Sequence, residues 1–138
     1  MCTRRFLACG AFALVLVACG GSSTNVANEV RAACEIGVPA IDATTSTWGQ
    51  TLDAYTASRE HSMKAAAKDS NWKGLDYAFS TLVAAWTDAV RAGGREATDT
   101  AIDPSKKAAA LQAEGKWVDA ADKAENLIRS ECASAQSS

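Results

Sequence analysis

Apolar residues recur at every third or fourth position along most of this chain, a spacing that places them on one face of an α-helix. From residue 25 onward, no stretch has the strict alternation of apolar and polar residues that is typical of a β-strand. We predict helices over 26–36, 48–68, 71–92 and 103–132, each with one apolar stripe. Such stripes become buried when helices pack together, so the expected fold class is all-α, a small bundle of three to four antiparallel helices.

Short polar or glycine-containing sequences predict where these helices begin and end. Gly37-Val38-Pro39 predicts the end of the first helix. The next apolar stripe covers 39–68, but Thr47-Trp48-Gly49-Gln50 matches a capping box, in which the side chains of Thr47 and Gln50 each accept from the other's backbone amide. We therefore expect a chain reversal around residues 44–49. The remaining boundaries are Asp69-Ser70-Asn71, Gly93-Gly94 and Asp103-Pro104, the last as N-cap and first-turn proline.

The N-terminal residues have a different pattern, two arginines followed by a short apolar stretch. Arg4 and Arg5 precede the uncharged stretch 6–18. This stretch is too short for a hydrocarbon core, which needs about 20 residues, but it suits the apolar region of a signal peptide. Thr3-Arg4-Arg5-Phe6-Leu7 also partly resembles a twin-arginine export motif, so the export route stays open.

The sequence Leu16-Val17-Ala18-Cys19 resembles the lipobox of bacterial lipoproteins. The resemblance implies that signal peptidase recognises Leu16, Val17 and Ala18 and cleaves before Cys19, which carries a diacylglyceryl group. The alternative is an ordinary secretory signal peptide with a chance cysteine. A lipobox implies a protein outside the cytoplasm, anchored by lipid in the outer leaflet of the cell membrane or in an outer membrane.

The chain is thus expected to have four parts. They are a signal peptide (1–18), a lipidated cysteine and flexible tether (19–25), a helical domain (26–132) and a disordered tail (133–138). Cleavage removes Arg4 and Arg5 from the 14 basic residues and leaves 12 against 16 acidic ones, a net charge of −4. A mildly acidic domain is repelled by an anionic membrane, so we expect it to project from the surface.

Five cysteines in a chain of 138 residues are the next feature to explain. Cys2 and Cys9 leave with the signal peptide, and Cys19 carries the lipid. Cys34 and Cys132 remain, and an even pair in an oxidising compartment predicts a disulfide, with two buried thiols as the alternative. If 39–68 were one unbroken helix, these two residues would lie about 40 Å apart. A disulfide therefore supports the reversal expected around 44–49.

No catalytic, metal-binding or nucleotide-binding motif occurs, so we expect no enzyme activity, no cofactor and no metal. The small net charge of −2, without a basic cluster, argues against nucleic acid. His61 is predicted to face solvent. The apolar stripe of the helix predicted over 48–68 includes Trp48, Leu52, Tyr55 and Met63, and Arg59 falls at its centre. Either its guanidinium reaches solvent, or it faces a groove and binds an acidic group, with Asp76 and Glu114 as candidate internal partners.

Four tryptophans lie on the predicted apolar stripes: Trp48, Trp72, Trp86 and Trp117. Tryptophans at helical spacing either anchor a core or line an apolar groove between helices. Glu114 and Glu125 lie near the apolar edge of the last helix. We expect an interaction module at the cell envelope that binds another envelope or extracellular protein. The alternative is a carrier of a small apolar ligand in a tryptophan-lined groove, with Arg59 as a further candidate binding residue.

Overall fold

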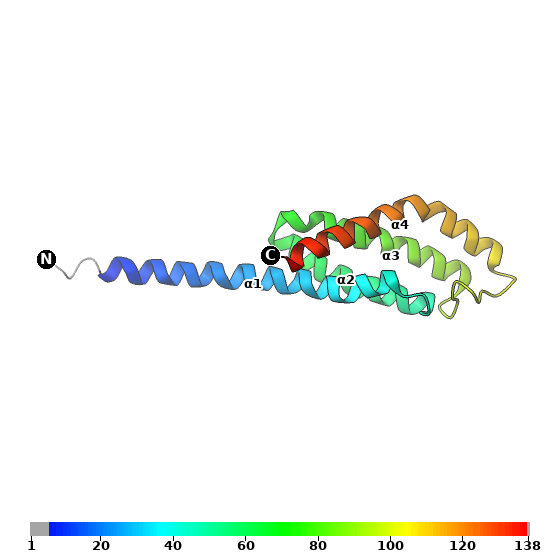
Figure 1. The fold of residues 1–138 in the computed structure, drawn as a ribbon, viewed down its shortest axis with the longest axis horizontal. Coiled ribbons are helices and arrows are strands. Elements are labelled where there is room, and N and C mark those ends of the chain that lie inside the picture. Colours follow the sequence, from blue (N-terminus) through cyan, green and yellow to red (C-terminus); the bar gives the residue numbers. More distant parts are fainter. Residues whose placement is uncertain (1–5, 138) are drawn as a thin grey trace.

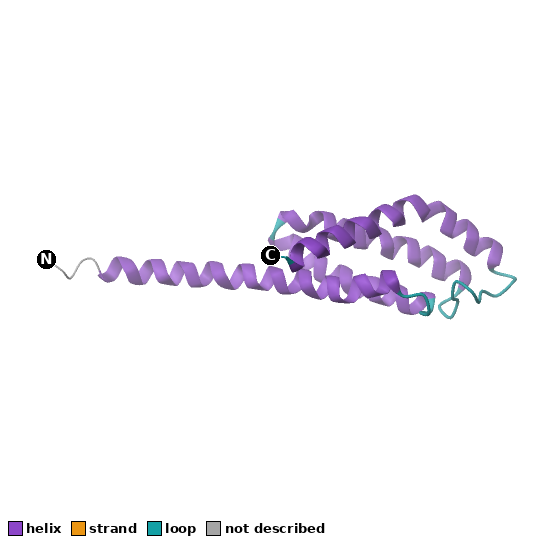
Figure 2. Ribbon diagram, viewed as in Figure 1, coloured by secondary structure: helices purple, strands orange, loops and turns teal. Residues whose placement is uncertain are grey.

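The computed structural model describes the backbone of residues 6–137 and the side chains of residues 24–137. The described chain contains four α-helices and one short 3-10 helix, with no strand: α1 (Phe6–Asp42), α2 (Trp48–Lys68), η1 (Ser70–Trp72), α3 (Lys73–Gly93) and α4 (Lys107–Gln136). The helices of the bundle run alternately up and down (Figures 1 and 2). The loops 43–47 and 94–106 lie at one end, and the α2–α3 turn and the C-terminus lie at the other. The predicted all-α bundle is confirmed.

The capping box at the start of α2 is confirmed in full. The amide of Gln50 donates to Thr47 Oγ1 (3.3 Å), and the amide of Thr47 donates to Gln50 Oε1 (2.9 Å). The loop 94–106 supplies further acceptors, because the amides of Trp48 and Gly49 donate to backbone carbonyls of that loop, at 2.8 and 2.9 Å. The reversal before Trp48 is therefore fixed both by its own residues and by a loop about fifty positions away in the sequence.

α1 does not end at Gly37-Val38-Pro39, as we had predicted, but continues to Asp42. Gly37 is instead a point of close packing, since a Cβ at this position would overlap the ring of Phe79. Pro39 lies within the last turn of α1. Its missing N–H removes one helical hydrogen bond, and the helix ends three residues later, at Asp42. The glycine and the proline thus shape the last turns of α1 without stopping it.

The N-terminal part of α1 projects beyond the bundle (Figure 1). Residues 19–25, predicted as a flexible tether, have helical backbone here. The side chains of Leu16, Val17, Ala18 and Cys19 lie outside the residues described in full, so cleavage and lipidation at this site remain predictions. Among the described residues, no helix has both the length and the apolar character that a bilayer crossing needs.

α4 begins and ends later in the sequence than predicted. Asp103 does not cap the helix; its carboxylate accepts from the amide and hydroxyl of Ser105, at 2.9 and 2.7 Å, and closes a turn before Lys107. These bonds lower the pKa of Asp103. At the other end the helix continues past Cys132 to Gln136.

The main core joins all four helices, but α2 presents a different face to it than predicted. Ser58 and Ser62 are fully buried, whereas Met63, on the predicted stripe, is 49% exposed. The buried face is rotated by roughly 65° from the predicted one, at 100° per residue. Each serine hydroxyl donates to a backbone carbonyl of its own helix, Ser58 to Ala54 and Ser62 to Arg59. The α2 face that packs into the core therefore combines Tyr55 with small side chains whose hydroxyls are bonded within the helix.

The predicted disulfide is present between Cys34 of α1 and Cys132 of α4, with the Cα atoms 5.6 Å apart. Both residues are buried and belong to the main core, which also includes Val30, Phe79 and Ile128. The bond joins the first and last helices of the bundle and closes a loop with a sequence separation of 98.

Candidate functional site

A groove of about 350 Å³ lies between α3 and α4. Its walls come from the C-terminal half of α3 and the N-terminal half of α4, and it is closed at the loop end of the bundle by residues of the loop 94–106 and by Trp48 of α2. The apolar side chains that shape it include Trp48, Trp86, Ile102, Leu111, Trp117 and Val118. Leu111 and Val118 are 54% and 49% exposed, so the groove leaves apolar surface in contact with solvent.

The groove exists because α1 is too short to cover this part of the bundle. The carboxylate of Asp42, the last residue of α1, accepts from Arg129 of α4 at 2.7 Å, so α1 ends beside the C-terminal third of α4. Between Ala110 and Ala124, no residue of α4 is buried. Figure 1 shows that α4 is curved over this region. The N-terminal half of α4 therefore packs over α3 without α1, which completes the core in the other half of the bundle.

A second, smaller apolar cluster forms the floor of the groove. Trp48 and Trp86 meet edge to face, with ring centroids 6.1 Å apart, and the ring centroid of Tyr55 lies 6.2 Å from that of Trp86. Trp48 Nε1 donates to Asp99 Oδ1 at 3.1 Å, which fixes the indole. Gly93 leaves the space that the Trp48 ring occupies, because a Cβ there would overlap it. The aromatic floor is thus held in place before any ligand binds.

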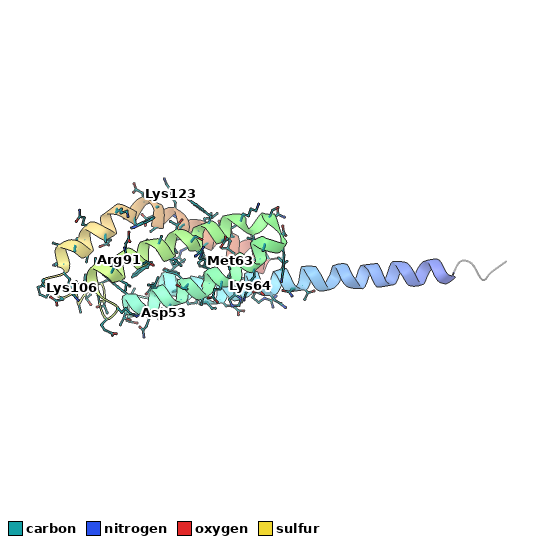
Figure 3. All side chains as sticks on the ribbon, turned by 180° about the vertical axis from the view of Figure 1, so that it is seen from behind. Asp53, Met63, Lys64, Arg91, Lys106 and Lys123 are labelled. Carbon is teal, nitrogen blue, oxygen red and sulfur yellow. A yellow bond between two sulfur atoms is a disulfide. The ribbon has the colours of Figure 1, made fainter. Side chains whose placement is uncertain are left out.

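The loop that closes the groove is tied to α2 by an ion pair as well as by the backbone bonds described above. Arg95 pairs with Asp53 and also donates to the carbonyl of Gly49. Figure 3 shows Asp53 near the end of the bundle where Lys106 also lies. The loop 94–106 therefore has a defined position against α2.

Trp117 forms part of the α4 wall and is oriented by Asp88 of α3. Its Nε1 donates to Asp88 Oδ2 at 2.9 Å, and Lys116 Nζ donates to the same oxygen at 3.0 Å. These two bonds, together with the nearby charges of Lys116 and Arg91, lower the pKa of Asp88. Lys116 Nζ also lies 4.9 Å from the centroid of the Trp117 ring. The carboxylate of Asp88 therefore holds the edge of the indole, and the ammonium group of Lys116 lies over its face.

Four carboxylates line the groove, against a single basic side chain, Lys107. The carboxylates are Asp99, Glu114, Asp122 and Glu125. Burial is the largest cause that raises the pKa of Glu125, and repulsion from Asp122 adds to it. Burial also raises the pKa of Tyr55, and the charge of Glu125 contributes. The apolar groove thus has a strongly negative rim.

The structure brings together three of the four predicted tryptophans. Trp48, Trp86 and Trp117 line the groove, whereas Trp72 packs against the main core at the opposite end of the bundle. The prediction that Arg59 lies at the centre of a buried stripe is wrong. Arg59 is exposed because the buried face of α2 is rotated away from it. Within residues 24–137 it forms no ion pair with Asp76 or Glu114.

Sequence reasoning missed several groove residues. Asp99, Ile102 and Lys107 come from the loop and the first turn of α4, where no periodicity indicates which way a side chain points. Leu111 and Val118 are seven residues apart, so they share one face of α4. That second apolar stripe was a usable signal, and it lies beside the alanine-rich stripe that packs into the core.

We predicted that His61 faces solvent, but in the structure it is only partly exposed and contacts another helix. Its Nδ1 lies 2.7 Å from Glu29 Oε2 of α1, and its side chain is 33% exposed. The hydrogen bond to His61 lowers the pKa of Glu29. The pair links α1 to α2 on the surface of the bundle, away from the groove.

Comparisons of the chain with protein-family models, curated proteins and solved structures find no match. Within residues 24–137, no three histidine, cysteine, aspartate or glutamate residues gather in an arrangement that would hold a metal ion. Function is therefore inferred from the groove and from the N-terminal sequence.

Proposed function

We propose that this protein is a lipid-anchored, extracytoplasmic lipoprotein whose helical domain binds a small apolar ligand in the groove lined by Trp48, Trp86 and Trp117. The observation that carries the proposal is the groove itself. Its volume of about 350 Å³ falls in the range of roughly 300–1,000 Å³ that is usual for small-molecule sites. Its aromatic floor is already in place, so little ordering opposes binding.

This function was the alternative in the sequence analysis, and the arrangement of exposed apolar residues favours it over a protein-interaction module. The large exposed apolar side chains within residues 24–137 are Met63, Tyr77, Leu111 and Val118. Leu111 and Val118 line the groove, while Met63 and Tyr77 lie on two other helices. Protein-binding sites usually present a larger continuous patch. A concave site with apolar walls is better suited to a small molecule.

Binding is tested with 5-fluorotryptophan incorporated into the full chain, held in lipid nanodiscs. Fluorine NMR gives one resonance for each tryptophan, and octanol is the probe. We expect saturable shifts of the Trp48, Trp86 and Trp117 resonances, and no shift of Trp72, which serves as an internal control. Equal drift of all four resonances, or no saturable shift, would contradict ligand binding and leave the protein-interaction function.

The anchoring part of the proposal rests on Leu16-Val17-Ala18-Cys19 and on the arginines and apolar stretch before it. Mass spectrometry of the mature N-terminus from bacterial membranes tests it directly. We expect a chain that begins at Cys19 and carries lipid. A free, unacylated start at another residue would show that the N-terminus is an ordinary signal peptide.

A further inference from the structure

We infer that the ligand of this groove is a cationic amphiphile, with its apolar chain against the tryptophans and its ammonium group among the carboxylates of the rim. The inference rests on the proposed function and specifies the chemical class of the ligand. It is carried by the carboxylates that line the groove, by the absence of ion pairs to them within residues 24–137 and by the tryptophans beside them.

The carboxylates of the rim are placed to act on one ligand. Glu114, Asp122 and Glu125 follow the groove along α4, and Asp99 faces them from the loop 94–106. Lys107 is the only basic residue among the lining side chains. A bound anion would be repelled by this set, whereas a bound cation would be attracted by several carboxylates at once.

These carboxylates also form no ion pair within the described part of the bundle, so no basic side chain there is bound to them. Within residues 24–137, Asp42, Asp53 and Asp88 pair with arginine or lysine. None of the four rim carboxylates forms such an ion pair in the same part of the chain. Burial and the neighbouring Asp122 outweigh the attraction of Arg129 and raise the pKa of Glu125, so its charged form is held in an unfavourable environment. A ligand cation would supply the missing counter-charge.

The tryptophans favour the same kind of head group. An ammonium group is attracted to the negative face of an indole ring within about 6 Å of its centroid. Trp117 already takes part in such a contact outside the groove lining, where Lys116 Nζ lies 4.9 Å from the centroid of its ring. Trp48 and Trp86 provide further indole surface on the floor. Aromatic faces combined with carboxylates select an organic cation over a neutral molecule of the same shape.

A small molecule fits these observations better than a basic segment of another protein. Specific protein interfaces bury about 800 Å² on each partner. The groove is confined to one end of the bundle and has the volume of a small-molecule site. A lysine-rich amphipathic peptide is therefore included in the test as a competing class of ligand.

The test compares three probes that share one alkyl chain: octyltrimethylammonium, octanol and octanoate. Each is titrated into the full chain in nanodiscs of zwitterionic lipid, below its critical micelle concentration, with the fluorine resonances of Trp117 and Trp72 as readout. We expect octyltrimethylammonium to bind about ten-fold more tightly than octanol, and octanoate to bind most weakly. Octanol binding as tightly as the cation would overturn the charge inference while supporting the proposed function. If no probe shifts Trp117, the proposed function itself fails.

Two double variants locate the effect. In Glu114→Gln/Asp122→Asn the affinity for octyltrimethylammonium should fall about five-fold, while that for octanol stays unchanged. The matched control, Glu60→Gln/Asp119→Asn, removes the same charge from exposed positions outside the groove and should change either affinity by less than about two-fold. Equal losses in the two double variants would overturn the assignment of the cation to this rim. Tighter binding of the lysine-rich peptide than of octyltrimethylammonium would overturn the choice of a small molecule.

Discussion

Gly37 offers the sharpest test of the packing that holds α1 in the bundle. The sequence suggested a helix stop, but the residue lies inside α1 and against Phe79. A Cβ at Gly37 would come closer than 3.0 Å to two carbons of the Phe79 ring and would reach 3.0 Å from Ser58 Oγ. Both Phe79 and Ser58 are fully buried, so neither has free space into which to move. We expect Gly37→Ala to destabilise the protein.

The magnitude follows from two opposing effects. Forcing an extra carbon into a close-packed core costs about 1–3 kcal/mol. Replacing glycine by alanine inside a helix contributes about 1 kcal/mol in the other direction. Gly115→Ala is the matched control, because Gly115 lies inside α4 and a Cβ there meets nothing within 4 Å. The helix term is the same in both variants, so the difference between them, about 1–3 kcal/mol, measures the clash with Phe79.

Urea unfolding of the disulfide-intact chain, followed by far-UV circular dichroism, measures both free energies of unfolding. Gly37→Ala should unfold at lower urea than the parent, and Gly115→Ala at higher urea. In thermal unfolding the two variants should differ by roughly 3–5 °C for each kcal/mol. If Gly37→Ala is as stable as Gly115→Ala, the close contact between α1 and α3 does not exist and Gly37 acts only as a helix terminator.

Three further predictions follow from other parts of the fold. Replacing Cys34 and Cys132 by serine should lower the free energy of unfolding by about 4–5 kcal/mol in the chain-entropy treatment, seen as a lower urea midpoint; an unchanged midpoint would show that the bond does not constrain the unfolded chain. Glu125→Gln should raise the melting temperature at neutral pH, because the folded state raises the pKa of Glu125 and so disfavours its charged form. That gain should disappear below about pH 4.5, where Glu125 is protonated in both states; a gain independent of pH would point to packing instead. Gly94→Ala should cost about 1–3 kcal/mol, since Gly94 has φ +99° and ψ 157°, and a melting temperature equal to the parent's would contradict the strained turn.

Local signals in the sequence predicted much of the bundle. The Thr47–Gln50 capping box depends on side chains three positions apart, so it could be read directly, and the structure has both of its bonds. The disulfide followed from counting cysteines, and its geometry then required the reversal that the capping box supplies. These features were predictable because each involves neighbouring residues or a choice with few alternatives.

The errors arose where side chains met residues distant in the sequence. Ser58 and Ser62 look polar in the sequence, yet their hydroxyls bond to carbonyls of their own helix and become fully buried. That rotated the packed face of α2 and left Arg59 exposed. The groove was even less predictable, because it depends on where α1 ends relative to α4. Asp42, the last residue of α1, lies beside Arg129 of α4. This position depends on how the two helices pack, and the spacing of apolar residues does not predict it.

The shortness of α1 also divides the bundle into halves with unequal resistance to local opening. The main core and the disulfide hold the half that α1 covers, whereas the groove half depends on a smaller cluster around Trp48, Ala97 and Ala110. Amide hydrogen exchange should therefore be faster in the first turns of α4 than near Cys132. The N-terminal part of α4 can then separate from α3 while the rest of the domain stays folded. Under the proposed function, a bound ligand would bridge α3 and α4 in this half, so binding should slow amide exchange there and leave exchange near Cys132 unchanged.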